Sequence, residues 1–145
     1  MTLAELTEIE TAIHSITELA SVPVVFGIDP SADDLSTSIP RIAFFSFSPK
    51  ENQRFVTKVF MGYPCKLCYY FALPKAYPND KTNIALLHSN ALLLRRALRA
   101  LEDRQTSGAC TFQIDVIDDP QEEIGISDTR GLAVLQFTLQ TIEPR

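Results

Sequence analysis

Residues 84–101 read IALLHSNALLLRRALRAL, and their apolar side chains recur every three or four positions. This spacing puts one apolar set on the same side of a helix: Ile84, Leu87, Ala91, Leu94, Leu98 and Leu101. Asp80, Thr82 or Asn83 can cap the start of the helix, and Ser107-Gly108 ends it. A helix with so long an apolar side needs a sheet or another helix to pack against, and the flanking sequence supplies both.

Three strand-like segments precede this helix, at residues 39–47, 54–61 and 66–73. Ser48-Pro49 closes the first segment, and Gly62-Tyr63-Pro64 separates the second from the third. Two short connections of this kind predict an antiparallel meander.

The N-terminal part predicts a helix over residues 3–20, with Thr2 and Glu5 forming a capping box. We expect the polar side of this helix to be solvent-exposed; it carries Glu5, Glu8, Thr11, Ser15 and Glu18. Residues 22–26 can form a short edge strand, and residues 27–38 read as a long loop.

After the long helix, two segments alternate apolar and polar residues, one through Phe112, Ile114 and Val116 and one over residues 133–139. Residues 118–131 between them read as an acidic connection. The whole chain therefore predicts a single α+β domain with the order α-β-β-β-α-β-β. We expect a mainly antiparallel sheet with two helices packed on one face.

Composition excludes some functions. The chain has 145 residues, 13 basic and 18 acidic, and a net charge of −5. Nucleic-acid binding of the non-specific kind needs an excess of Lys and Arg, which is absent. No apolar run approaches the roughly 18 residues of a membrane span, and the acidic N-terminus is unlike a signal peptide. We therefore expect a cytosolic protein with no membrane partner.

Few residues suggest chemistry. Cys65-Lys66-Leu67-Cys68 is a C-x-x-C motif, but it sits at the start of a strand rather than before a helix. A zinc site would draw on a set without a second paired motif: Cys65, Cys68, Cys110 and His88. Asp33-Asp34 and Asp118-Asp119 lack the spacing of a calcium loop. We predict no catalytic residue, cofactor or metal, and therefore no enzyme.

The predicted central strands are apolar on both faces, unlike the last two. In the first strand Ala43, Phe45 and Phe47 oppose Ile42 and Phe44, and in the third Leu67, Tyr69, Phe71 and Leu73 oppose Cys68, Tyr70 and Ala72. An exposed band of that composition exceeds what a monomer normally tolerates. We interpret it as a contact with another copy of the chain, through Phe45, Phe47 and Tyr70. The alternative is that the loop at residues 27–38 folds over this face.

A basic stripe on the long helix gives a second candidate contact. Arg95 and Arg99 fall in one narrow stripe beside its apolar side, and Arg96 is adjacent to them in sequence. They either form a solvated face paired with Glu102 and Asp103, or meet the acidic residues of a neighbouring copy. The acidic candidates are Asp118, Asp119 and Glu122.

The order of elements resembles that of the tail terminator, or tail completion, proteins of long-tailed bacteriophages. The resemblance lies in the N-terminal helix, the Asp-rich loop closing on Ser38-Ile39-Pro40-Arg41-Ile42, the meander, and the long helix at 84–101. The strand at 132–142 completes it. It covers nearly the whole chain without a diagnostic motif.

The resemblance implies a virion structural protein that forms a ring, typically a hexamer. Such a ring caps the finished tail tube, stops its polymerisation and presents a surface to the neck. Its partners would be copies of itself, the tail tube protein and a neck or connector protein. DNA would pass through the ring without sequence-specific contact. The location would be the tail–neck junction of the virion, and the host cytoplasm during assembly.

Two other classes remain open. One is a small cytosolic enzyme or metal or redox module built on Cys65, Cys68 and the Asp33-Asp34 loop. The other is a dimeric ligand-binding α+β domain whose apolar sheet face lines a pocket.

Overall fold

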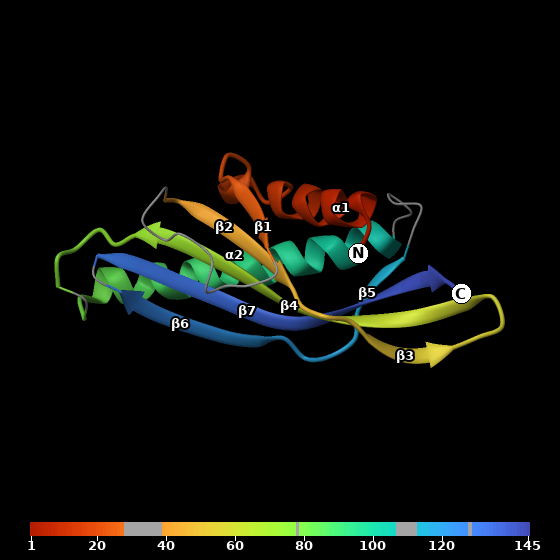
Figure 1. Ribbon diagram of the computed structural model, residues 1–145. Coiled ribbons are helices and arrows are strands. Elements are labelled where there is room, and N and C mark those ends of the chain that lie inside the picture. Colours follow the sequence, from red (N-terminus) through yellow and green to blue (C-terminus); the bar gives the residue numbers. More distant parts are fainter. Residues whose placement is uncertain (28–38, 78, 107–112, 128) are drawn as a thin grey trace.

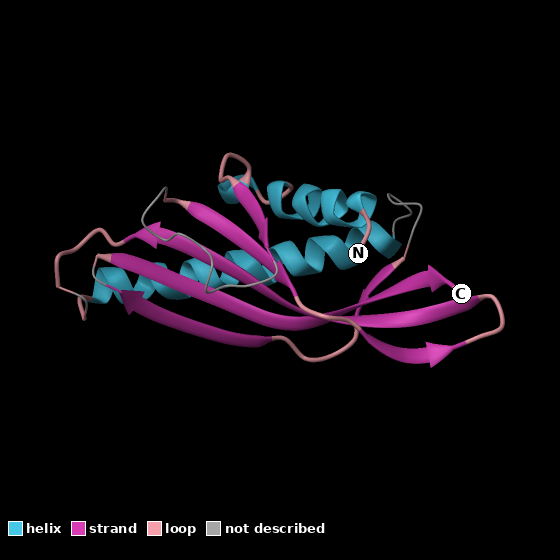
Figure 2. Ribbon diagram, viewed as in Figure 1, coloured by secondary structure: helices cyan, strands magenta, loops and turns pink. Residues whose placement is uncertain are grey.

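Two long antiparallel strands form the centre of the fold. β4 (Lys58–Ala72) and β7 (Arg130–Pro144) pair over their full length, from Lys58 opposite Pro144 to Ala72 opposite Arg130. This computed structural model describes residues 1–27, 39–77, 79–106, 113–127 and 129–145. Within these ranges, seven strands form one sheet with both helices on the same face (Figures 1 and 2).

Shorter strands widen each half of the central pair. At one end, β2 (Arg41–Ser46) pairs with β4, and β1 (Val24–Gly27) adds to β2 as a parallel edge strand. β6 (Gln121–Ser127) flanks β7 at the same end. At the other end, β3 (Lys50–Arg54) pairs with β4 and β5 (Ile114–Val116) pairs with β7. The sheet is therefore one long two-stranded ribbon, with different neighbours at its two ends.

The helices begin at the caps that the sequence indicates. α1 (Leu3–His14) starts with a complete capping box between Thr2 and Glu5. At the start of α2 (Lys81–Thr106), the Asp80 carboxylate accepts a hydrogen bond of 2.8 Å from the backbone N–H of Thr82. The α+β class, the expected order of helices and strands, and the placement of both helices on one face are confirmed.

One apolar core lies between the helices and the sheet. It joins α1 (Ile9, Ala12, Ile13) and α2 (Leu87, Ala91, Leu94, Leu98, Leu101) to alternate residues of the central strands, among them Phe44, Leu67, Leu135 and Leu139. The predicted apolar side of the long helix is thus confirmed except at Ile84, whose side chain is exposed. Because strand side chains alternate between faces, every second residue of β2, β4 and β7 enters this core.

The predicted break at Gly62-Tyr63-Pro64 is wrong, because β4 runs straight through these residues. Proline cannot donate a ladder hydrogen bond and is tolerated where a neighbouring strand ends. Pro64 lies where the chain passes from β2 to β3: its carbonyl oxygen accepts from Phe47 N–H at 2.9 Å, and no strand residue follows Phe47 until Lys50. The two predicted strands at 54–61 and 66–73 are therefore one strand.

Gly62 is a strand residue over which a side chain of the neighbouring strand packs. A Cβ atom at this position would lie 2.7 Å from Nδ2 of Asn52, which packs across it from β3. The actual hairpin turn is at residues 55–57, where Phe55 N–H donates to the carbonyl oxygen of Lys58 at 2.8 Å. No glycine, proline or asparagine marks this turn in the sequence.

The predicted acidic connection at 118–131 is also partly wrong, since β6 occupies residues 121–127. Ile124 and Ile126 pack against the helix-side core opposite Ala133 and Gly131. The period-two pattern is short and surrounded by acidic residues, which explains why composition suggested a loop. The predicted loop at 27–38 lies outside the described residues apart from Gly27, which ends β1.

The first helix is shorter and less solvated than predicted. α1 ends at His14, and a 3₁₀ turn, η1 (Thr17–Leu19), replaces its expected last turns. Glu5 and Glu8 are buried rather than exposed. Both carboxylates have partners: Glu5 closes the capping box, and Glu8 accepts hydrogen bonds from the Arg104 guanidinium at the far end of α2. A charge-assisted pair therefore joins the two helices.

We predict that Leu94→Ala lowers the free energy of unfolding by about 2–5 kcal/mol, because Leu94 is buried beneath α2 and its truncation leaves a cavity. Leu92→Ala is the matched control on the same helix, where the side chain is 42% exposed. We expect a change within about 0.5 kcal/mol for the control. Urea denaturation monitored by circular dichroism measures both; equal losses would mean that α2 is rotated from the position described.

Candidate functional site

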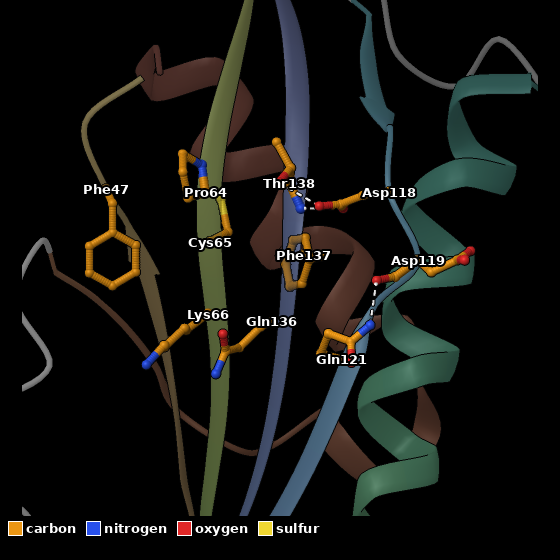
Figure 3. A pocket seen from close by; sticks show the side chains of 10 residues that line it. All are labelled: Phe47, Pro64, Cys65, Lys66, Asp118, Asp119, Gln121, Gln136, Phe137 and Thr138. Carbon is orange, nitrogen blue, oxygen red and sulfur yellow. Dashed lines mark hydrogen bonds between the residues drawn. The ribbon is translucent and has the colours of Figure 1, made fainter. Parts of the chain in front are cut away.

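One hollow opens on the sheet face opposite the helices. It has a volume of about 350 Å³ and is lined by Phe47, Pro64, Cys65, Lys66, Asp118, Asp119, Gln121, Gln136, Phe137 and Thr138. Figure 3 shows side chains from β4 and β7 in its middle, with Phe47 on one side and the two aspartates on the other. It forms where β2 has ended and the chain between β5 and β6 passes along β7.

The polar groups of this hollow largely hold the fold. The Asp118 carboxylate accepts hydrogen bonds from Thr138 N–H at 2.8 Å and from the Thr138 hydroxyl at 2.7 Å (Figure 3). The side-chain amide of Gln121 donates to the Asp119 carbonyl oxygen at 3.4 Å. These bonds pin the β5–β6 connection to β7. Lys66 and Gln136 leave a hydrogen-bonding surface. The Thr138 hydroxyl does contact a carboxylate, but the same carboxylate also accepts the Thr138 backbone N–H, so this contact holds the chain to β7.

The one thiol at this hollow is held in its neutral form. Cys65 is buried in the helix-side core, and its Sγ lies 3.2 Å from the Tyr63 carbonyl oxygen, to which it can donate. Burial raises the pKa of Cys65 to about 12. A thiol must be ionised to act as a nucleophile or a metal ligand, so this environment opposes both roles at neutral pH.

The C-x-x-C motif is divided between the two faces of the sheet. Cys65 belongs to the helix-side core, whereas Cys68 belongs to a second apolar cluster on the opposite face. Three residues apart on one strand, the two side chains must point in opposite directions. They cannot close a disulfide or share one metal ion, and both are free thiols. The described residues contain no group of three or more potential metal ligands; Cys110 and Asp33-Asp34 lie outside them.

The predicted basic and acidic contacts meet within one chain. Arg95 Nε lies 3.0 Å from a carboxylate oxygen of Glu122, so α2 is paired with β6 directly. Arg96 pairs with Glu18 at 3.5 Å, with both side chains largely exposed. Arg99 forms no ion pair with any described residue. The predicted pairing of the α2 arginines with the acidic segment therefore occurs for Arg95, but its partner, Glu122, is in the same molecule. An intersubunit role for Arg99 stays a prediction.

The predicted exposed aromatic band is not exposed. Phe45 and Tyr70 are 3% and 8% exposed in the single chain, together with Ala43, Cys68 and Val134. Arg41 lies over the Tyr70 ring, 5.2 Å from its centroid, and Phe47 is half-buried at the cluster edge. This face therefore needs no partner to bury it, and the argument for assembly from these aromatics is lost. The alternative cover, residues 28–38, lies outside the described residues.

A different apolar surface is exposed, and no pattern in the sequence indicates it. The turn between β3 and β4 carries Phe55 and Val56, which are 40% and 88% exposed. The sequence pattern placed these residues inside a strand, where one of them would be covered. The hairpin arm, residues 50–61, projects past the ends of both helices (Figure 1). Leu3, Tyr77 and the β1 residues Val25 and Phe26 are also exposed, but Val56 at the end of the arm is the most exposed of these side chains.

Comparison with models of known protein families finds no match for this chain, and comparison with curated proteins finds none either. Neither helix in the described ranges combines the length and the apolar character needed to cross a membrane.

We predict that the Cys65 thiol makes stability fall at alkaline pH. In the unfolded chain a thiol ionises near its ordinary pKa of about 8.5, while the folded-state pKa is about 12. The stabilisation is complete below pH 8.5 and is lost as the pH rises toward the folded value, at up to about 1.4 kcal/mol per pH unit.

Urea denaturation of the parent and of Cys65→Ala between about pH 8 and pH 10 measures this effect, a window below the ordinary pKa of tyrosine. The parent should lose stability faster with pH than the variant, whatever the difference in their absolute stabilities. Parallel pH profiles would show that Cys65 is not the titrating group.

Proposed function

We propose that this chain is a structural subunit that assembles with copies of itself into a ring, and that the ring terminates the tail tube of a long-tailed bacteriophage. In this role the ring caps the tube and joins it to the neck connector of the head. The protein acts by presenting surfaces rather than by catalysing a reaction.

The observation that carries the proposal is the hairpin arm with its apolar tip, residues 55–57. A side chain as exposed as Val56 contributes little buried apolar area in the single chain. Yet the tip is held in place: Arg145 N–H donates to the Thr57 carbonyl oxygen at 3.1 Å, and the Phe55 and Phe60 rings pack edge to face at 5.3 Å. A rigid apolar projection suits a contact with another protein, because little entropy is lost on binding.

The distribution of charge also supports self-assembly. The arm carries three basic residues and one acidic residue. Residues 113–127, which include β5 and β6, carry five acidic residues and no basic ones. β3 flanks β4, whereas β5 and β6 flank β7. The basic and the acidic residues therefore lie on opposite edges of the sheet. Two copies related head to tail would bring them together, and contacts of this type generate rings or filaments.

The form of the assembly follows from the resemblance. The α+β order on which the resemblance to tail terminators rests is the order observed in this fold. The side chains of Cys65 and Cys68 lie on opposite faces of the sheet. This arrangement argues against the metal or redox alternative. The phage location and the partners, a tail tube protein and a neck protein, remain part of the proposal.

We predict that the purified protein forms a closed, metal-free ring, with six copies as the expected number. Native mass spectrometry measures both subunit number and bound metal in one experiment. Rings of one defined size without metal support the structural role. A stable monomer carrying stoichiometric zinc would contradict it and favour the enzyme or metal-binding class.

We also predict that assembly weakens with salt, because oppositely charged surfaces meet across the contact. Between about 0.1 M and about 1 M salt the Debye length falls from about 10 Å to about 3 Å. Sedimentation velocity at several protein concentrations should show the association constant falling over this range. Association that is equal or stronger at high salt would mean that the charge pattern plays no part in the contact.

A further inference from the structure

Besides the projecting tip, one hollow on the helix side of the molecule is unused by the fold. It lies between α2 and the chain around β6, and is lined by Arg95, Leu98, Arg99, Glu102, Pro120, Glu122 and Leu135. Leu98 and Leu135 are buried side chains that form its apolar floor, and charged side chains surround them. The Arg95 guanidinium and the Glu122 carboxylate form an ion pair of 3.0 Å on the rim, and this pair holds one part of the rim in place.

The size of this hollow matches the tip. Its volume is about 260 Å³. A cavity of about 150 Å³ is large enough to hold benzene, so the hollow has room for the Val56 side chain and an edge of the Phe55 ring. The apolar tip would meet an apolar floor and would itself lose contact with water, whereas the floor residues are already buried in the single chain.

The charges around the two features match as well. Lys58 lies beside the tip, with Nζ 5.5 Å from the centroid of the Phe55 ring. The rim of the hollow carries two arginines and two glutamates, of which Arg95 and Glu122 are paired with each other, so the acidic excess near it comes from residues 118–119. Arg99 can donate to a backbone carbonyl oxygen of an entering turn.

The tip and the hollow cannot meet within one molecule. The floor residue Leu135 lies nine positions from Pro144, which pairs with Lys58 at the base of the tip. At about 3.3 Å per residue, the two features are about 30 Å apart along the straight ribbon of β7. Only another copy can bring a tip to this hollow.

We propose that the hairpin tip of one copy, with Val56 at its apex, inserts into the hollow between α2 and β6 of the next copy. The contact is heterologous, because different surfaces of the same chain meet, and repetition around an axis closes a ring. This inference rests on the proposed self-assembly and names the two surfaces that form it.

Disulfide trapping tests the contact. Val56→Cys and Arg99→Cys are introduced singly and together in a Cys110→Ser background, in which the remaining native thiols, Cys65 and Cys68, are buried. After mild oxidation of the assembled protein, the double variant should give a ladder of covalent multimers on a denaturing gel. Each single variant should give none, because its new thiol faces an unaltered surface of the neighbour.

A matched pair of substitutions gives a second measurement. Val56→Ser should weaken association about tenfold, since the buried apolar contact is lost. Tyr77→Ser removes another highly exposed apolar side chain, far from the tip in sequence, and should leave association unchanged. Both variants should keep the melting temperature of the separated chain.

The outcomes separate the two proposals. If the parent assembles but the double variant gives no ladder, or Val56→Cys alone gives covalent dimers, the tip does not enter this hollow and only the contact is wrong. If the parent stays a single chain at every concentration, the proposed function fails together with the contact.

Discussion

The pairing of β4 with β7 is the interaction on which the rest of the structure depends. It runs through fifteen residue pairs without interruption. One half supplies the surface that α1 and α2 cover, and the other half reaches beyond the helices as the hairpin arm (Figure 1). Toward the hairpin arm, the Tyr63 hydroxyl of β4 donates a hydrogen bond of 2.5 Å to the Glu143 carboxylate of β7. This bond joins the two strands through their side chains. Burial and this carboxylate raise the pKa of Tyr63, so the hydroxyl keeps its proton over the physiological range.

The apolar clusters and the projecting arm lie in different halves of the ribbon (Figure 1). The half of the ribbon under the helices carries both apolar clusters, one on each face, and its polar groups are largely engaged in holding strands and helices in place. The other half carries the exposed side chains of β3 and of the tip. In the proposed assembly, such a division would let the contact surface change without disturbing the core.

Much of the fold could be predicted from the sequence, because the spacing of apolar residues and the helix-capping residues are local signals. The α2 stripe from Leu87 to Leu101 and the Thr2–Glu5 box identify both helices. The strand boundaries could not be predicted, because Gly62 and Pro64 are typical turn residues. Only the structure shows that Asn52 packs over the glycine and that β2 ends beside the proline. The site was harder still. Whether Phe45 and Tyr70 are buried depends on the whole chain, and a turn made of Phe55, Val56 and Thr57 carries no turn residue to reveal it.

The most direct test of the account is hydrogen–deuterium exchange on the assembled protein and on chains dissociated by dilution. Backbone amides at residues 55–58 should become protected on assembly, together with those around residues 117–123 at the edge of the hollow, while the β4–β7 core stays equally slow in both states. Joint protection of the tip and the hollow is the predicted result. Identical exchange in the two states, or protection confined to the Phe45–Tyr70 face, would contradict it.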